Sequence, residues 1–68
     1  MKELVFKNNL KALREKKNLS QQKLADMVST TRQTIIAIEK GTFSPTARLA
    51  YLLCIALDVK FEDMFYFE

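Results

Sequence analysis

The spacing of apolar side chains predicts a helix over residues 31–40 with one buried face and one outward face. Ile35 and Ile38 share one side of this helix, because residues three positions apart lie on the same face. The opposite side, with Ile36 at its margin, carries Gln33, Ala37 and Lys40. A helix of only about ten residues is marginal in water, so neighbouring segments must hold it, and its outward face stays open to a partner.

Sequence signals mark both ends of this helix and the helix before it. Thr31 is the predicted N-cap, and Gly41 suits the left-handed conformation that often follows a helix. The preceding helix is predicted over residues 20–28, with Ser20 as its cap. Only two residues separate the helices, so they must cross steeply at a tight turn. This is the pattern of a helix-turn-helix.

The remaining elements complete a mainly helical prediction. Strand propensity without helical spacing predicts a short strand at residues 4–6. The other predicted elements are a first helix from Lys7 or Asn8 to Lys17 closed by Asn18, a fourth helix from Pro45 to about Leu57 with Ser44 as its N-cap, and a last helical turn near residues 62–65. The fourth helix is expected to bury Leu49, Leu52, Leu53, Ile55 and Ala56, and its apolar surface is wider than one core needs.

The composition limits the chain to one small domain, residues 1–68. An apolar fraction of 49% with a single Gly and a single Pro excludes disorder and favours helices. A core of this size supplies little stability, so extra burial by self-association is expected. No apolar run approaches the roughly 18 residues of a membrane span, and no signal-peptide stretch opens the chain. We therefore expect a cytoplasmic protein with no membrane partner.

Charge is distributed unevenly along the chain. Residues 1–40 hold nine Lys and Arg against four Asp and Glu, whereas residues 41–68 hold two against four. The first part, which contains the helix at residues 31–40, would attract a polyanion, and the second part would be repelled by it. Lysines on solvated helices explain some of this excess, but its asymmetry favours a nucleic acid as the partner.

Catalytic and metal chemistry find little support in the sequence. The chain has no histidine and one cysteine, Cys54, so it lacks the residues of a metal cluster or an internal disulfide. Cys54 lies in an apolar run and is predicted to be a small core residue. Histidine is the commonest general acid–base group, and a phosphate-cradling loop needs several glycines. We therefore expect neither an enzyme nor a cofactor.

Five blocks in order along the chain carry a family resemblance. They are Leu19-Ser20-Gln21, Leu24-Ala25, Arg32-Gln33-Thr34-Ile35, Ile38-Glu39-Lys40-Gly41 and Pro45. In this order and spacing they resemble the Xre family of lambda-repressor and Cro-type regulators, and most of all its small stand-alone members. The resemblance implies an all-α, five-helix lambda-repressor-like domain that binds DNA through residues 31–40. The two termini are expected to add a short two-stranded antiparallel sheet, with Tyr66 and Phe67 against residues 4–6.

The expected DNA contacts divide into base contacts and phosphate contacts. A glutamine amide can bond both N6 and N7 of adenine, and a small alanine leaves room for a thymine methyl. The base-reading candidates are Arg32, Gln33, Thr34 and Ala37. The phosphate candidates are Gln21, which stands where the family places such a contact, and Lys40, Thr42 and Ser44, which line the loop after the helix. The family also implies a brace between Arg14 and Glu39 that would hold the first helix against the third.

Apolar side chains crowd the carboxyl terminus, and they are too many for the surface of so small a monomer. Some must fold back onto the core, and we expect others to form a twofold interface with the fourth helix. The interface candidates are Met64, Phe65, Tyr66 and Phe67. The sequence thus predicts a homodimeric transcriptional regulator, a repressor, that places two recognition helices in successive major grooves of a near-palindromic DNA operator.

Two other functions remain open on the same fold, namely a DNA-binding antitoxin and a protein-interaction module. Ile36 is aliphatic at a place where a DNA-reading face would carry a polar residue, although an aliphatic side chain can contact a thymine methyl. A neighbouring toxin gene would favour the antitoxin. The sequence identifies no protein effector.

Overall fold

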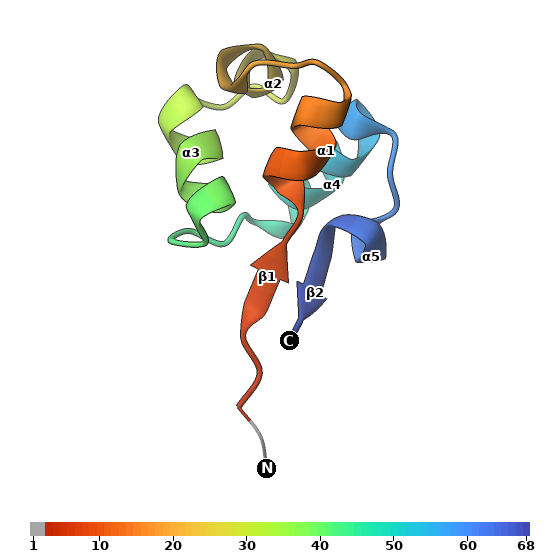
Figure 1. Ribbon diagram of the computed structural model, residues 1–68. Helices are drawn as coiled ribbons and strands as arrows, with labels where there is room; N and C mark the ends of the chain where they lie inside the picture. The colour runs from red at the N-terminus through yellow and green to blue at the C-terminus, as the bar shows by residue number, and fades with distance from the viewer. Residues whose placement is uncertain (1–2) are drawn as a thin grey trace.

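The computed structural model describes residues 3–68, and Met1 and Lys2, which the predicted domain included, lie outside the described residues. Within residues 3–68 the chain forms five helices and two short strands (Figure 1). In chain order they are β1 (Phe6–Asn8), α1 (Leu10–Lys16), α2 (Gln21–Met27), α3 (Arg32–Lys40), α4 (Ala47–Leu57), α5 (Phe61–Met64) and β2 (Phe65–Phe67). The five-helix prediction is confirmed.

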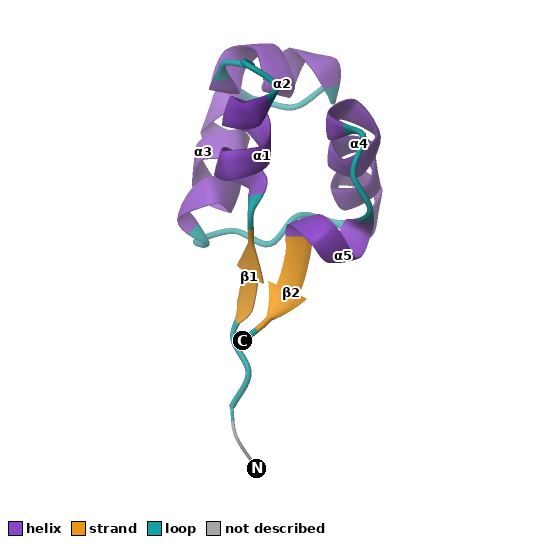
Figure 2. Ribbon diagram, turned by 45° about the vertical axis from the view of Figure 1, so that its right-hand side comes forward, coloured by secondary structure: helices purple, strands orange, loops and turns teal. Residues whose placement is uncertain are grey.

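The two strands form an antiparallel sheet that extends from the helical body (Figures 1 and 2). Phe6 pairs with Phe67, and Asn8 pairs with Phe65. Backbone bonds of 3.0 Å between Val5 and Glu68 continue the ladder by one pair. The predicted sheet is therefore present, but β1 begins two residues later than expected. The register of the sheet follows from the pair nearest the helices, Asn8 with Phe65, because the Phe65 side chain is buried in the core.

The helix-turn-helix is made by α2 and α3, and its predicted caps are confirmed. The Ser20 side chain accepts a hydrogen bond from Lys23 N, and the Thr31 side chain accepts one from Thr34 N. Gly41 follows α3 with a φ of 78°, in the left-handed region where a side chain is disfavoured. These caps limit both helices to short segments that present defined faces.

Two helix starts differ from the sequence prediction. Helix α1 begins at Leu10, because Asn8 belongs to β1 and its side-chain oxygen accepts from the Leu10 backbone N–H. Helix α4 begins after Thr46, whose hydroxyl accepts from Leu49 N at 3.2 Å, so the prediction of Ser44 as the cap is wrong. The sequence offers two capping hydroxyls around Pro45, and the structure uses the second.

The core lies between the helices and takes one stripe from α4. That stripe consists of Ala50, Leu53, Cys54 and Leu57, spaced three or four residues apart. Ile55 is 74% exposed because it lies off this stripe, so its predicted burial is wrong. Leu49, Leu52 and Ala56 are only partly buried at its margins, and Leu53 is fully buried as expected.

Cys54 is buried, as the apolar run around it predicted. Burial, followed by the negative charge of Glu62, raises the pKa of its thiol. The group therefore remains a neutral thiol at physiological pH, which suits a small core residue.

Met64 and Phe65 belong to the same core, and this corrects their assignment to an interface between subunits. Met64 is fully buried and Phe65 is 3% exposed within a single chain. A side chain already enclosed by its own chain has no surface left to offer a second copy. Phe67 remains 62% exposed and Tyr66 is half-buried.

Candidate nucleic-acid interface

The carboxylate of Glu39, in the last turn of α3, collects hydrogen bonds from two other helices. Arg14 of α1 donates from Nε to Oε2 at 2.6 Å and from Nη2 to Oε1 at 3.2 Å. Gln21 of α2 donates from Nε2 to Oε1 at 3.1 Å. The side chains of Arg14 and Glu39 are only 9% and 5% exposed. The pair implied by the family resemblance is therefore present as a buried, bidentate contact.

Arg14 also extends this network to the chain between α1 and α2. Its Nη1 donates to the Leu19 carbonyl at 2.8 Å. The hydrogen bond to Glu39 raises the pKa of Arg14, while burial acts in the opposite direction. The guanidinium therefore stays charged, and one cation connects α1, the start of the helix-turn-helix and α3. Because these bonds are directional, they fix the rotation of α3 as well as its distance from the core.

The buried face of α3 agrees with the predicted pattern. Ile35 and Ile38 are fully buried. Arg32, Gln33 and Lys40 are exposed, and Ala37 and Ile36 are half-buried. Since both isoleucines anchor one side of a short helix, the exposed polar groups point to a common outward side.

Several hydroxyls near this face already have partners within the chain. Thr34 is half-buried, and its hydroxyl lies 3.0 Å from that of Thr31, the N-cap. Thr42 donates its hydroxyl hydrogen to the Ala37 carbonyl at 3.2 Å, and its backbone N–H donates to the same oxygen at 3.0 Å. Ser44 is exposed in the loop before α4. Thr42 therefore caps α3, and its hydroxyl is a weaker phosphate donor than the ammonium of Lys40.

The sequence interpretation missed a second polar contact to the end of α3. Asn8 of β1 donates from Nδ2 to the Ile38 carbonyl at 2.9 Å. The two residues are 30 positions apart, and an asparagine before a helix is ordinarily read as a local cap. In the folded chain β1 lies beside the end of α3, and its residues line one pocket together with Glu39, Lys40 and Gly41.

Five aromatic rings form a continuous series from the sheet to α4, which we call the aromatic row. Its members in spatial order are Phe67, Phe6, Phe65, Phe61 and Tyr51, with successive ring centroids 5.1, 5.7, 5.0 and 6.1 Å apart. Phe65 is buried, whereas Phe67 and Tyr51 are each 62% exposed. These rings belong to β1, β2, α5 and α4, and Figures 1 and 2 show the sheet and α5 at the end of the helical body away from α2.

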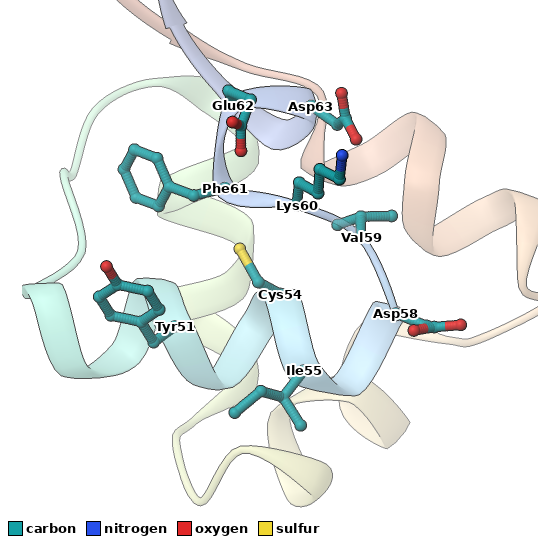
Figure 3. A pocket seen from close by; sticks show the side chains of 9 residues that line it. All are labelled: Tyr51, Cys54, Ile55, Asp58, Val59, Lys60, Phe61, Glu62 and Asp63. Carbon is teal, nitrogen blue, oxygen red and sulfur yellow. The ribbon is translucent and has the colours of Figure 1, made fainter.

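An open groove of about 870 Å³ lies between α4 and α5, at the end of the row formed by Phe61 and Tyr51. Tyr51 and Phe61 lie side by side at one end of the groove, and the sulfur of Cys54 points toward α5 (Figure 3). Three carboxylates, those of Asp58, Glu62 and Asp63, line it together with Lys60. This acidic edge would repel a phosphate backbone, in contrast to the basic first half of the chain.

The sequence model of the helix-turn-helix family matches residues 10–64. Similar curated proteins are the uncharacterized HTH-type transcriptional regulator YgzD of Bacillus subtilis and an uncharacterized HTH-type transcriptional regulator of Methanocaldococcus jannaschii. Each is 47% identical over 63 residues, which cover 93% of this chain and 96% of the relative.

Two solved structures share the fold, each with a TM-score of 0.75 over 79% of this chain. The restriction-modification controller protein C.AhdI of Aeromonas hydrophila is 30% identical, with 78% of its own chain covered. The clp gene regulator ClgR of Corynebacterium glutamicum is 22% identical, with 57% covered. Within residues 3–68, no helix combines the length and the apolar character needed to cross a membrane.

Proposed function

Because the chain belongs to the Xre-type helix-turn-helix family of transcriptional regulators, we propose that it is a repressor that reads a specific double-stranded DNA operator in the cytoplasm. The observation that carries the proposal is the buried contact of Arg14 and Gln21 with Glu39. This contact fixes a short helix whose outward side is polar and exposed. A fixed polar helix suits the major groove, which is wide enough to admit it.

Base reading falls to the first two turns of α3. The exposed amide of Gln33 can accept a hydrogen bond from the N6 amino group of adenine through Oε1 and donate one to N7 through Nε2, which gives a bidentate contact. Arg32 and Thr34 flank it, and the small side chain of Ala37 leaves space for a thymine methyl. Ile36, half-buried at the margin, adds an apolar contact of the same kind.

Phosphate contacts frame this reading surface. Lys40 is exposed at the end of α3 and supplies a full positive charge. Gln21 uses one amide hydrogen on Glu39, which leaves its second hydrogen for a phosphate oxygen. Ser44 has an exposed hydroxyl, and Thr42 contributes only if its hydroxyl exchanges the Ala37 carbonyl for phosphate. These contacts set position, and the residues of α3 set sequence preference.

Homodimer formation through the aromatic row completes the proposal. Phe67 and Tyr51 end the row and remain exposed, together with Ile55 beside the groove. A second copy related by a twofold axis would cover this apolar surface. Two copies of α3 held about 34 Å apart would then meet successive major grooves of a near-palindromic site.

Selection of bound fragments from random duplex DNA tests the proposal, with the enriched sequence then compared with random duplex in a binding titration. We expect an enriched sequence with twofold symmetry, bound at least about 1,000-fold more tightly than random DNA. Selection that enriches no sequence would reject specific DNA reading and favour the protein-interaction module.

A further inference from the structure

Asn8 contacts two elements at once through its side-chain amide. Its Oδ1 accepts from the backbone N–H of Leu10 at 3.0 Å, and its Nδ2 donates to the carbonyl of Ile38 at 2.9 Å. This orientation of the amide is the one that satisfies both partners. A flipped amide would place Nδ2 against the Leu10 N–H, which are both donors, and Oδ1 against the Ile38 carbonyl, which are both acceptors. Asn8 is half-buried, so water competes weakly for these bonds.

The bond to Ile38 is not required to satisfy the end of α3. The backbone N–H of Gly41 already donates to the Ile38 carbonyl at 2.9 Å, as part of the left-handed cap. A carbonyl oxygen has two lone pairs, so the amide of Asn8 takes the second. What this bond adds is a connection between β1 and the last turn of α3.

From this contact, and resting on the proposed DNA-reading function, we propose that Asn8 is a positioning residue that fixes α3 relative to the terminal sheet. Asn8 pairs with Phe65 in the sheet, and Phe65 stacks on Phe6 with parallel rings. The aromatic row and α3 are thereby joined through one amide. A copy that docks on the row would transmit its position to the DNA-reading helix.

Asn9 provides a matched control for this proposal. Its Nδ2 also donates to a backbone carbonyl, that of Asp63, at 3.1 Å. It joins the start of α1 to α5 and makes no bond to α3. Substituting each asparagine by serine removes one amide donor of the same kind without changing charge, and a serine at residue 8 can still accept from Leu10 N.

The experiment measures the affinity of the wild type, Asn8→Ser and Asn9→Ser for the selected operator and for random duplex DNA, with urea unfolding alongside. We expect Asn8→Ser to lose roughly fivefold in operator affinity, because the freed helix end spends time in orientations that do not bind. Its affinity for random DNA should stay unchanged, and Asn9→Ser should keep the wild-type ratio. Asn8→Asp retains the shape of the side chain and its acceptor but removes the amide donor. At high salt it should show the same loss of operator affinity as Asn8→Ser.

Amide hydrogen exchange at Gly41 and Thr42 gives a readout independent of DNA. We expect exchange at both residues to be several-fold faster in Asn8→Ser and unchanged in Asn9→Ser. An unchanged exchange rate, or an unchanged ratio of operator to random affinity in a folded Asn8→Ser, would overturn the positioning role. A wild type that fails to distinguish the selected duplex from random DNA would instead overturn the proposed function, and the exchange result would still decide the role of Asn8.

Discussion

The two sides of this small domain are held by different kinds of contact. On the side of α3, a buried guanidinium, a carboxylate and two amides bond across α1, α2, α3 and β1. On the side of α4, α5 and β2, aromatic rings pack in a row that also takes in Phe6 of β1 and whose ends remain exposed. Hydrogen bonds are directional, whereas apolar burial is not. The first side therefore fixes the orientation of α3, and the second side presents apolar surface area to a partner.

The largest expected effect comes from breaking the directional side. Arg14→Ala or Glu39→Ala should each destabilise the fold by about 3–5 kcal/mol, because each leaves a buried charge without its partner. An exposed pair would contribute only about 0–1 kcal/mol. Urea unfolding of both single variants and the double variant measures the coupling. A coupling energy of zero would mean that the two charges act independently, despite their burial.

The next effect concerns the aromatic side. Phe67→Asp should abolish self-association while leaving the monomer folded, because the ring is 62% exposed and loses mainly its contact with Phe6. Phe65→Asp should unfold the chain instead, since Phe65 is in the core. Sedimentation equilibrium at micromolar concentration tests this difference.

Phe43→Asp serves as the control for that experiment. Phe43 is 46% exposed in the loop after α3 and lies outside the aromatic row. The Phe43→Asp variant should associate like the wild type.

A wild-type protein that is a monomer and binds its operator as one protein per duplex would refute the dimer, even if α3 reads the DNA.

A smaller effect is expected where charge acts without specificity. Lys40→Ala should weaken binding to operator and random DNA alike and reduce the slope of log affinity against log salt by about one unit. Lys60→Ala, beside the groove between α4 and α5, should leave the slope unchanged. An unchanged slope in Lys40→Ala would remove Lys40 from the phosphate contacts.

Local sequence signals predicted most of the fold but not the contacts between distant segments. The caps at Ser20 and Thr31 and the turn at Gly41 depend on neighbouring residues, and all three are as predicted. The predicted start of α4 is wrong because Ser44 and Thr46 are both good caps and only packing selects between them.

In the candidate site, too, contacts between distant residues could not be predicted from local sequence. The pair of Arg14 and Glu39 was expected only because a family resemblance implied it, since nothing local connects residues 25 positions apart. The contact of Asn8 with Ile38 had no such guide. Phe65 and Phe67 look alike in sequence and share one face of β2, because side chains two residues apart in a strand point the same way. Phe65 is buried because it directly follows α5 beside the core, whereas Phe67 pairs with Phe6 further along the sheet and is 62% exposed.

The most direct test of DNA reading by α3 is the effect of Gln33→Ala on sequence preference. We expect a loss of about 1–3 kcal/mol on the selected operator and a far smaller loss on random duplex, because the amide contacts bases and not phosphates. Titration of both duplexes at one salt concentration gives the two values. Equal losses on both, or none on either, would contradict the claim that α3 reads DNA sequence.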